Sequence, residues 1–213
     1  MTPAGFTISV LRQLRTVRRQ VSTSVFQSLI VALVLSWLDY CNSVLFGLPA
    51  NLFQHLQSVQ NAAARLIFRI LRSEHITPAL ISLHWLCIPE RIYFKLSFMT
   101  YRSIHGTSPS CLQSCFTRFS DMTSRQRLRS STSHCLAVLP VRLSTVGRCA
   151  FPVSGATVWY DLSLHVASAP SLAVFRQRLQ TFLFSHSYQD TIIWLVCYYH
   201  HSSLLSGHLW SLQ

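Results

Sequence analysis

Residues 51–66 read NLFQHLQSVQNAAARL, and the apolar positions in this stretch recur at intervals of three and four. Such spacing puts apolar side chains along one face of an α-helix. The positions concerned are Leu52, Leu56, Val59, Ala63 and Leu66. The stretch therefore predicts an amphipathic helix with one side in a core, and its run of alanines allows a neighbouring helix to approach closely.

Further helices are predicted on both sides of this stretch. Their expected ranges are 6–20, 25–38, 88–105 and 154–160, with a final helix that begins at Pro170-Ser171 and buries Leu172, Phe175, Leu179, Phe182 and Leu183. Ser22 or Ser24 is suited to cap the helix over 25–38. Gly47 and Pro49 interrupt the chain before the helix that starts at 51.

Between these helices lies a stretch rich in Ser, Thr and Arg, with two short strands expected at 136–139 and 149–153. The predicted fold is mainly α: a small helical bundle with a basic irregular middle segment and one or two short strands. Four parts are expected along the chain. They are a helical region over 1–116, a basic flexible segment over 117–149, a C-terminal helical region over 150–187 and a tail over 188–213.

The chain carries a formal net charge of +12, made by seventeen arginines and a single lysine, Lys95, against six acidic residues. The guanidinium group is a planar fork that binds phosphate oxygens in pairs, so an excess of arginine favours a polyanionic partner. A GC-rich coding sequence that encodes arginine often explains the bias equally well. The composition leaves both explanations open.

Three groups of arginines are candidate contacts to the RNA or DNA backbone. The first forms a basic stripe on the helix over 6–20, the second shares one face at the end of the helix from 51, and the third alternates in the irregular segment. The groups are Arg12, Arg15, Arg18 and Arg19; Arg65, Arg69 and Arg72; and Arg125, Arg127 and Arg129. Solvated helix faces and a solvated linker are the alternatives.

The acidic residues do not suit polymerase chemistry, which needs carboxylates that converge on two metal ions. No two of the six are adjacent, and none is spaced to share a helix face with another. We expect Asp39 and Asn42 to satisfy backbone donors in a turn. No catalytic residue, cofactor or small-molecule substrate is expected, and the chain is not predicted to be an enzyme.

Seven cysteines at irregular spacing indicate reduced thiols in an intracellular protein, cytoplasmic or nuclear. Cys111 and Cys115 are expected to be small apolar side chains on a helix face, so no metal site is predicted. We interpret His75 and His84 as hydrogen-bonded structural groups. The apolar run over 25–38 is shorter than the ~20 residues of a membrane span, which favours a buried helix.

An ordered series of motifs covers most of the chain. It reads LDYCNSVLFGLP at 38–49, LQSVQNAAARLIF at 56–68, HITPALISLHWL at 75–86, VRLSTVGRCAFPVSGATVWYDL at 141–162 and SAPSLAVFRQRLQTFLF at 168–184. This series resembles the region after the polymerase core in the reverse transcriptases of non-LTR retrotransposons (LINE elements) of the chicken-repeat and jockey-like kinds. The resemblance implies that the catalytic carboxylates of the RNA-directed DNA polymerase lie upstream of this region.

The resemblance thus implies a retrotransposon-derived fragment without the polymerase active site, whose thumb-side helices contact nucleic acid. The chain departs from the family pattern at Arg148-Cys149 and at Tyr160, and residues 188–213 match nothing in it, as read-through sequence would. Two alternatives are a genomic remnant without molecular activity, prone to self-association through exposed apolar faces, and a weakly membrane-associated protein.

Overall fold

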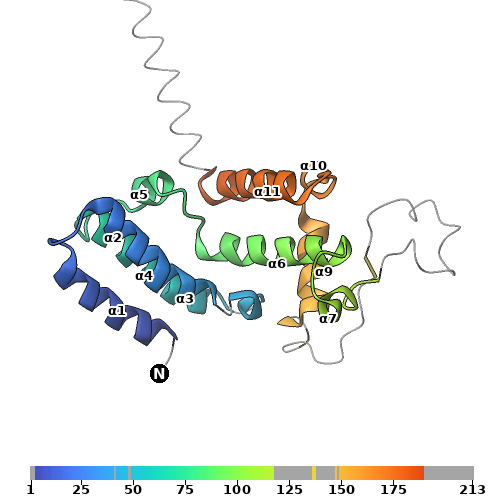
Figure 1. The fold of residues 1–213 in the computed structure, drawn as a ribbon, viewed down its shortest axis with the longest axis horizontal. Coiled ribbons are helices and arrows are strands. Elements are labelled where there is room, and N and C mark those ends of the chain that lie inside the picture. The colour runs from blue at the N-terminus through green and yellow to red at the C-terminus, as the bar shows by residue number, and fades with distance from the viewer. Residues whose placement is uncertain are drawn as a thin grey trace, which may run out of the picture.

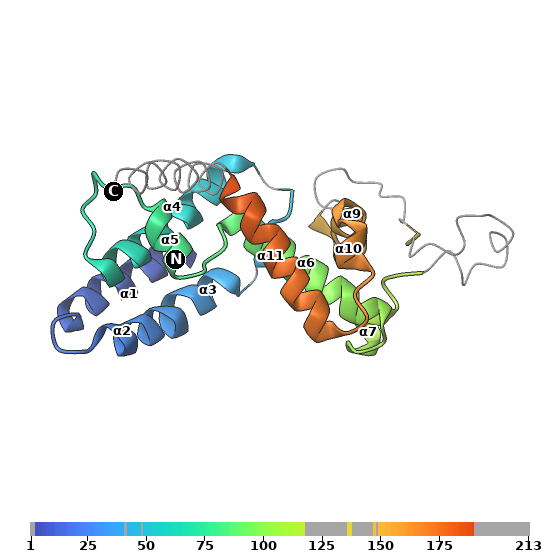
Figure 2. The ribbon, with the colours of Figure 1, turned by 90° about the horizontal axis from the view of Figure 1, so that it is seen from above.

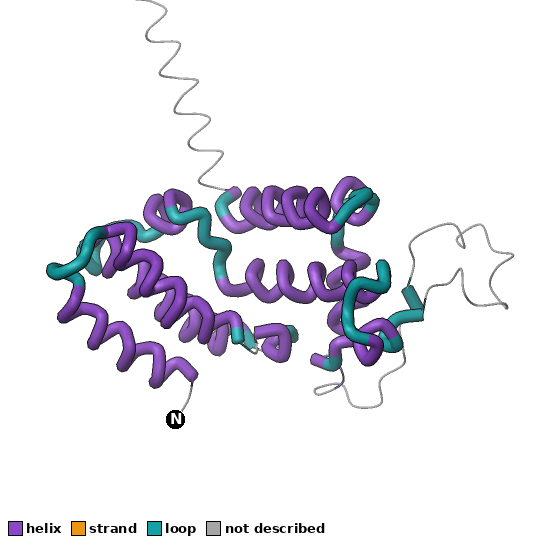
Figure 3. Tube along the Cα trace, in the orientation of Figure 1, coloured by secondary structure: helices purple, strands orange, loops and turns teal. Residues whose placement is uncertain are grey.

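The computed structural model describes residues 3–40, 42–47, 49–117, 136–137, 147 and 149–189. Within these ranges the chain is mainly helical, as the hydrophobic spacing predicts (Figures 1 and 3). The helices pack against one another and are joined by turns, so the prediction of a helical bundle is confirmed. The candidate contacts Arg125, Arg127 and Arg129 lie outside the described residues.

The N-terminal part is a hairpin of α1 (Pro3–Val17) and a second, longer helical stretch. That stretch consists of α2 (Thr23–Ile30), a π-helical turn (Val31–Leu35) and α3 (Ser36–Asp39). Ser22 caps α2, because its hydroxyl accepts a hydrogen bond from the amide of Val25. Phe26, Ile30 and Val34 are fully buried, which confirms a core helix over 25–38.

No helix in the described part of the chain combines the length and the apolar character that crossing a membrane requires.

The amphipathic helix predicted from residues 51–66 is α4 (Ala50–Phe68). A 3₁₀ turn (Asn42–Leu45) and Gly47, whose φ of 79° suits glycine, bring the chain to its start. Val59, Ala63 and Ile67 are buried, and α1 and α2 pack on this side. The face predicted from the spacing is therefore the face that the fold buries, although Leu52 at its beginning remains exposed.

Beyond α4 the chain forms α5 (Thr77–Ser82), α6 (Ile88–Ile104) and α7 (Ser110–Gln113). The C-terminal part consists of α9 (Phe151–Asp161), α10 (Leu164–Ala167) and α11 (Leu172–Ser187). Ser171 caps α11 through the amide of Val174. Phe175, Leu179 and Leu183 are buried along α11 as predicted, whereas Leu172 and Phe182, also predicted to be buried, are half-buried.

Two hydrophobic cores share α6, which lies between the N-terminal helices and α11 (Figures 1 and 2). Ile88, Ile92 and Leu96 belong to the first core, whose other members come mainly from α1 to α5. Tyr101 belongs to the second core, together with Trp159 and side chains of α10 and α11. The helical regions predicted over 1–116 and 150–187 therefore pack against the same helix.

The strand predicted over 149–153 is wrong, because Phe151, Pro152 and Val153 form the first turn of α9. Proline suits this place, since the first amides of a helix have no intrahelical acceptor to lose. Apolar runs this short do not distinguish a strand from a buried helix. Of the strand predicted over 136–139, only Leu136 and Ala137 are described, and the Ala137 amide donates to the Thr117 carbonyl (2.8 Å).

Gly155 sets how closely α9 approaches α6. A Cβ at this position would lie 2.6 Å from the Oγ1 of Thr100 and 2.7 Å from the ring of Phe116. We expect Gly155→Ala to lower the free energy of unfolding by about 1–3 kcal/mol, the usual cost of overpacking a core. Urea titration checks this prediction. An unchanged or raised midpoint in Gly155→Ala would contradict this packing.

Candidate nucleic-acid interface

The basic stripe predicted on α1 divides into two kinds of arginine. Arg12, Arg15 and Arg19 are exposed, whereas Arg18 is only 9% exposed. The guanidinium group of Arg18 lies over the ring of Phe26, with its Cζ 4.9 Å from the ring centroid. Arg18 therefore lies inside the fold, where a phosphate group does not reach it, and the remaining three arginines stay at the surface.

Arg18 joins the end of α1 to the end of α4. Its Nη2 donates to the carbonyl of Ile67 (2.9 Å), and its Nε donates to the carbonyl of Leu66 (3.3 Å). Carbonyls in the last turn of a helix have no intrahelical donor, and a cation there also suits the helix dipole. A further bond from Nη2 to Thr23 holds the start of α2 (3.3 Å). The guanidinium group of Arg18 therefore connects the ends of α1 and α4 with the start of α2.

The prediction that Arg65, Arg69 and Arg72 share one helix face is wrong, because α4 ends at Phe68. Arg69 has φ 59° and ψ 34°, a left-handed conformation that stops the helix. Arg65 turns back over the next residues, and its Nη1 donates to the carbonyls of Leu71 and Glu74. The side chain of Arg65 thus fixes the turn, whereas Arg69 and Arg72 are exposed on it.

Because of these contacts, exposed arginines of the first two predicted groups lie at the same end of the molecule. Arg15 and Arg19 flank the buried Arg18, and Arg69 and Arg72 follow the carbonyls to which Arg18 binds. Figures 1 and 2 both place the α1–α2 connection and the end of α4 at the same end. We call Arg15, Arg19, Arg69 and Arg72 the basic end. Glu74 lies nearby, where its carboxylate accepts the amide of Leu71 (3.2 Å).

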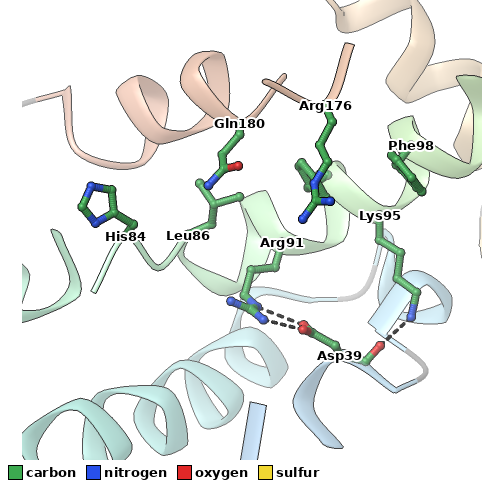
Figure 4. A pocket seen from close by; sticks show the side chains of 9 residues that line it. Asp39, His84, Leu86, Arg91, Lys95, Phe98, Arg176 and Gln180 are labelled. Carbon is green, nitrogen blue, oxygen red and sulfur yellow. Dashed lines mark hydrogen bonds and ion pairs between the residues drawn. The ribbon is translucent and has the colours of Figure 1, made fainter. Parts of the chain in front are cut away.

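A second basic site, absent from the sequence predictions, is a cavity of about 380 Å³ between α3, α6 and α11 (Figure 4). It is lined by Asp39, His84, Leu86, Arg91, Phe94, Lys95, Phe98, Arg176 and Gln180. Among these described lining residues Asp39 is the one carboxylate, against three side chains with permanent positive charge. We call this cavity the α6–α11 pocket.

Asp39 forms an ion pair with α6 that the sequence pattern did not indicate. Its carboxylate accepts two hydrogen bonds from Arg91, one from Nε (2.9 Å) and one from Nη2. The main-chain carbonyl of Asp39 accepts a hydrogen bond from the Nζ of Lys95. The end of α3 therefore holds both cations of α6 at the edge of the pocket, as the dashed lines in Figure 4 show.

Cations and aromatic rings alternate along the pocket face of α6. Arg91, Phe94, Lys95 and Phe98 have the spacing i, i+3, i+4 and i+7, which puts them on one helix face. The sequence carries this signal, but the stronger apolar stripe of Ile92, Leu96 and Met99 on the same helix dominates the pattern. The pairing of Asp39 with Arg91, 52 residues apart, has no local signal.

The histidines and cysteines singled out in the sequence differ in their surroundings, and neither His75 nor His84 has a side-chain hydrogen bond to the residues that the structure describes. His84 has φ 54°, and its ring is stacked 6.0 Å from that of Phe184, whereas His75 is exposed. The predicted helix face shared by Cys111 and Cys115 is wrong, because α7 ends at Gln113 and Cys111 is exposed. The Sγ of Cys115 donates to the Cys111 carbonyl (3.3 Å). Burial is the main cause that raises the pKa of the Cys87 thiol, which faces the Tyr188 hydroxyl. Within the described ranges, no three His, Cys, Asp or Glu side chains are grouped as a metal ion would require.

Comparison with known proteins gives no relative from which a function can be transferred. No protein-family model, curated protein or solved structure matches the chain. The resemblance to retrotransposon reverse transcriptases therefore stays a prediction, and the interpretation of the site depends on its geometry and charge.

Proposed function

We propose that this chain is a nucleic-acid-binding module whose basic end contacts the phosphate backbone of RNA or DNA without strong sequence preference. We propose further that it derives from the region after the polymerase core of a retrotransposon reverse transcriptase, an origin that rests on the motif series. The observation that carries the binding proposal is the pair of hydrogen bonds from Arg18 to Leu66 and Ile67. Through them, two basic segments about 50 residues apart in the sequence come to one end of the fold.

The chemistry of the basic end suits a polyanion. Four exposed guanidinium groups offer forked donors to phosphate oxygens, and contacts to phosphate position a strand without reading its sequence. The nearby Glu74 is engaged with a backbone amide. The side chains that build this end, Arg18 and Arg65, donate to main-chain carbonyls rather than to carboxylates. The local excess of positive charge therefore remains available to a partner.

Replacement of the four arginines tests this proposal. We expect the variant with Arg15, Arg19, Arg69 and Arg72 changed to Gln to bind single-stranded RNA at least about tenfold more weakly than the wild type at ~50 mM salt. Fluorescence anisotropy with a labelled strand measures the affinity. The slope of log K against log salt should become less negative by about 3 in the variant, since each phosphate contact on a single strand contributes about −0.7.

A charge-conserving variant is the matched control. Changing the same four positions to Lys keeps the positive charge and should retain most of the salt slope, although the forked geometry is lost. Circular dichroism checks that each variant keeps its helices. Equal affinities of the wild type and the Gln variant would contradict the basic end as the site. Absence of RNA binding by the folded wild type would favour the remnant without molecular activity.

A further inference from the structure

The α6–α11 pocket combines positive charge with aromatic rings. Arg176 extends from α11 toward the pocket face of α6 (Figure 4). It makes no hydrogen bond or ion pair with the described residues of the chain. On the opposite edge, Arg91 and Lys95 are held by Asp39. One carboxylate among three cations leaves a net positive site, which favours an anionic ligand.

Phe98 gives the pocket a face that the cores do not use. It is half-buried, and within the described chain it belongs to neither hydrophobic core. Its ring lies parallel to that of Phe94, with an interplanar angle of 8° and 6.1 Å between centroids. The Cζ of Arg102 lies 6.0 Å from the Phe98 centroid, on the next turn of α6. A large aromatic side chain at a pocket wall outside the core is suited to contact a planar ligand.

We propose that the α6–α11 pocket binds one nucleotide of a single-stranded nucleic acid, with the phosphate near Arg176 and Lys95 and the base against Phe98. This inference rests on the proposed function, because it places a second contact on the strand that the basic end holds. A cavity of about 380 Å³ falls within the size range of small-molecule sites, and stacking of bases on aromatic rings beside cations is how single strands are bound.

The two sites lie far enough apart to be tested separately. The pocket adjoins the end of α3, near the start of α4, whereas the basic end lies at the other end of α4. A helix of 19 residues is about 28 Å long at 1.5 Å per residue. A strand of roughly 15 nucleotides exceeds this length even at 3.4 Å per nucleotide, so one strand can occupy both sites.

The test compares two strands of equal length and charge, an oligoadenylate and an abasic ribose-phosphate strand, both bound to the full chain at ~50 mM salt. The wild type should bind the oligoadenylate about tenfold more tightly, since one stacked base contributes an effect of this order. In Phe98→Leu this preference should disappear, while the affinity for the abasic strand stays unchanged. A thermal melt confirms that Phe98→Leu is folded.

A charge variant tests the phosphate contact. Arg176→Gln should weaken the binding of oligoadenylate about fivefold or more, whereas Arg178→Gln, on the same helix but outside the pocket, should change it less than twofold. Arg178 donates to the carbonyl of His165 and serves as the matched control. Adenosine monophosphate, added as a competitor, shows whether the pocket takes a free nucleotide. Competition that Phe98→Leu abolishes would support the same site.

The outcomes separate the two proposals. Equal affinity of the wild type for both strands, or a base preference that persists in Phe98→Leu, overturns the pocket proposal and leaves the basic end untouched. If the wild type binds the oligoadenylate but not the abasic strand, the basic end is overturned and the pocket is supported. Failure of the folded wild type to bind either strand overturns both.

Discussion

Arg18→Met is expected to lower the free energy of unfolding by about 2–4 kcal/mol, because hydrogen bonds from a charged donor contribute about 1.5–3 kcal/mol and the acceptors left behind are buried or partly buried. The substitution removes the donors to Leu66, Ile67 and Thr23 and the cation above Phe26. Methionine keeps much of the length and apolar contact of the stem. Chemical denaturation followed by circular dichroism measures the loss.

Arg19→Met is the control for Arg18→Met. It removes the same charge from the next position, where the side chain is exposed, and should change stability by less than about 0.5 kcal/mol. RNA binding should respond in the opposite way. Arg19→Met should weaken RNA binding, because Arg19 belongs to the basic end. Folded Arg18→Met should keep it, because Arg18 does not face solvent. Equal stability of the two variants would contradict the role of Arg18 in joining α1 to α4.

Phe175→Ala is expected to lower the free energy of unfolding by about 3–5 kcal/mol, the range for removing a buried phenylalanine. Phe175 is fully buried, and its ring lies 4.2 Å from that of Tyr101 and 6.2 Å from that of Trp159. It therefore joins α11 to both α6 and α9. In a chain of this length the thermal midpoint should fall by about 10 °C, as a differential scanning calorimetry trace would show.

The same experiment tests whether the two cores unfold together. Because α6 contributes side chains to both, we expect one cooperative transition that moves as a whole in Phe175→Ala. Phe182→Ala, at a half-buried position of the same helix, should give a smaller shift. Two separate transitions in Phe175→Ala, with the transition of the first core at an unchanged midpoint, would contradict the sharing of α6 and favour separate helical regions.

Sequence spacing predicted the helices well where one apolar face decides the structure. Val59 and Ala63 on α4 and Phe175 and Leu179 on α11 are buried as their spacing indicates. The pattern could not place the end of α4, because Arg69 stops the helix in a conformation that glycine or asparagine usually adopts. The turn is stabilised instead by Arg65 through main-chain carbonyls, which side-chain periodicity does not reveal.

The candidate site was predictable in its chemistry and not in its arrangement. An excess of arginine in clusters is visible in the sequence, but its division into inward and outward side chains is not. Arg18 sits one residue from Arg19 and points into the fold because the end of α4 presents unpaired carbonyls there. The α6–α11 pocket depends on the approach of α3 and α11 to α6, and such contacts between distant segments leave no local pattern.

Arginine footprinting with a dicarbonyl reagent, read out by peptide mass spectrometry with and without single-stranded RNA, tests most directly whether the basic end holds nucleic acid. The predicted result is that RNA protects Arg15, Arg19, Arg69 and Arg72 together. Arg18 should be unreactive in both states, and Arg178 should react equally in both. Reaction of the four basic-end arginines at an unchanged rate under saturating RNA would contradict the account.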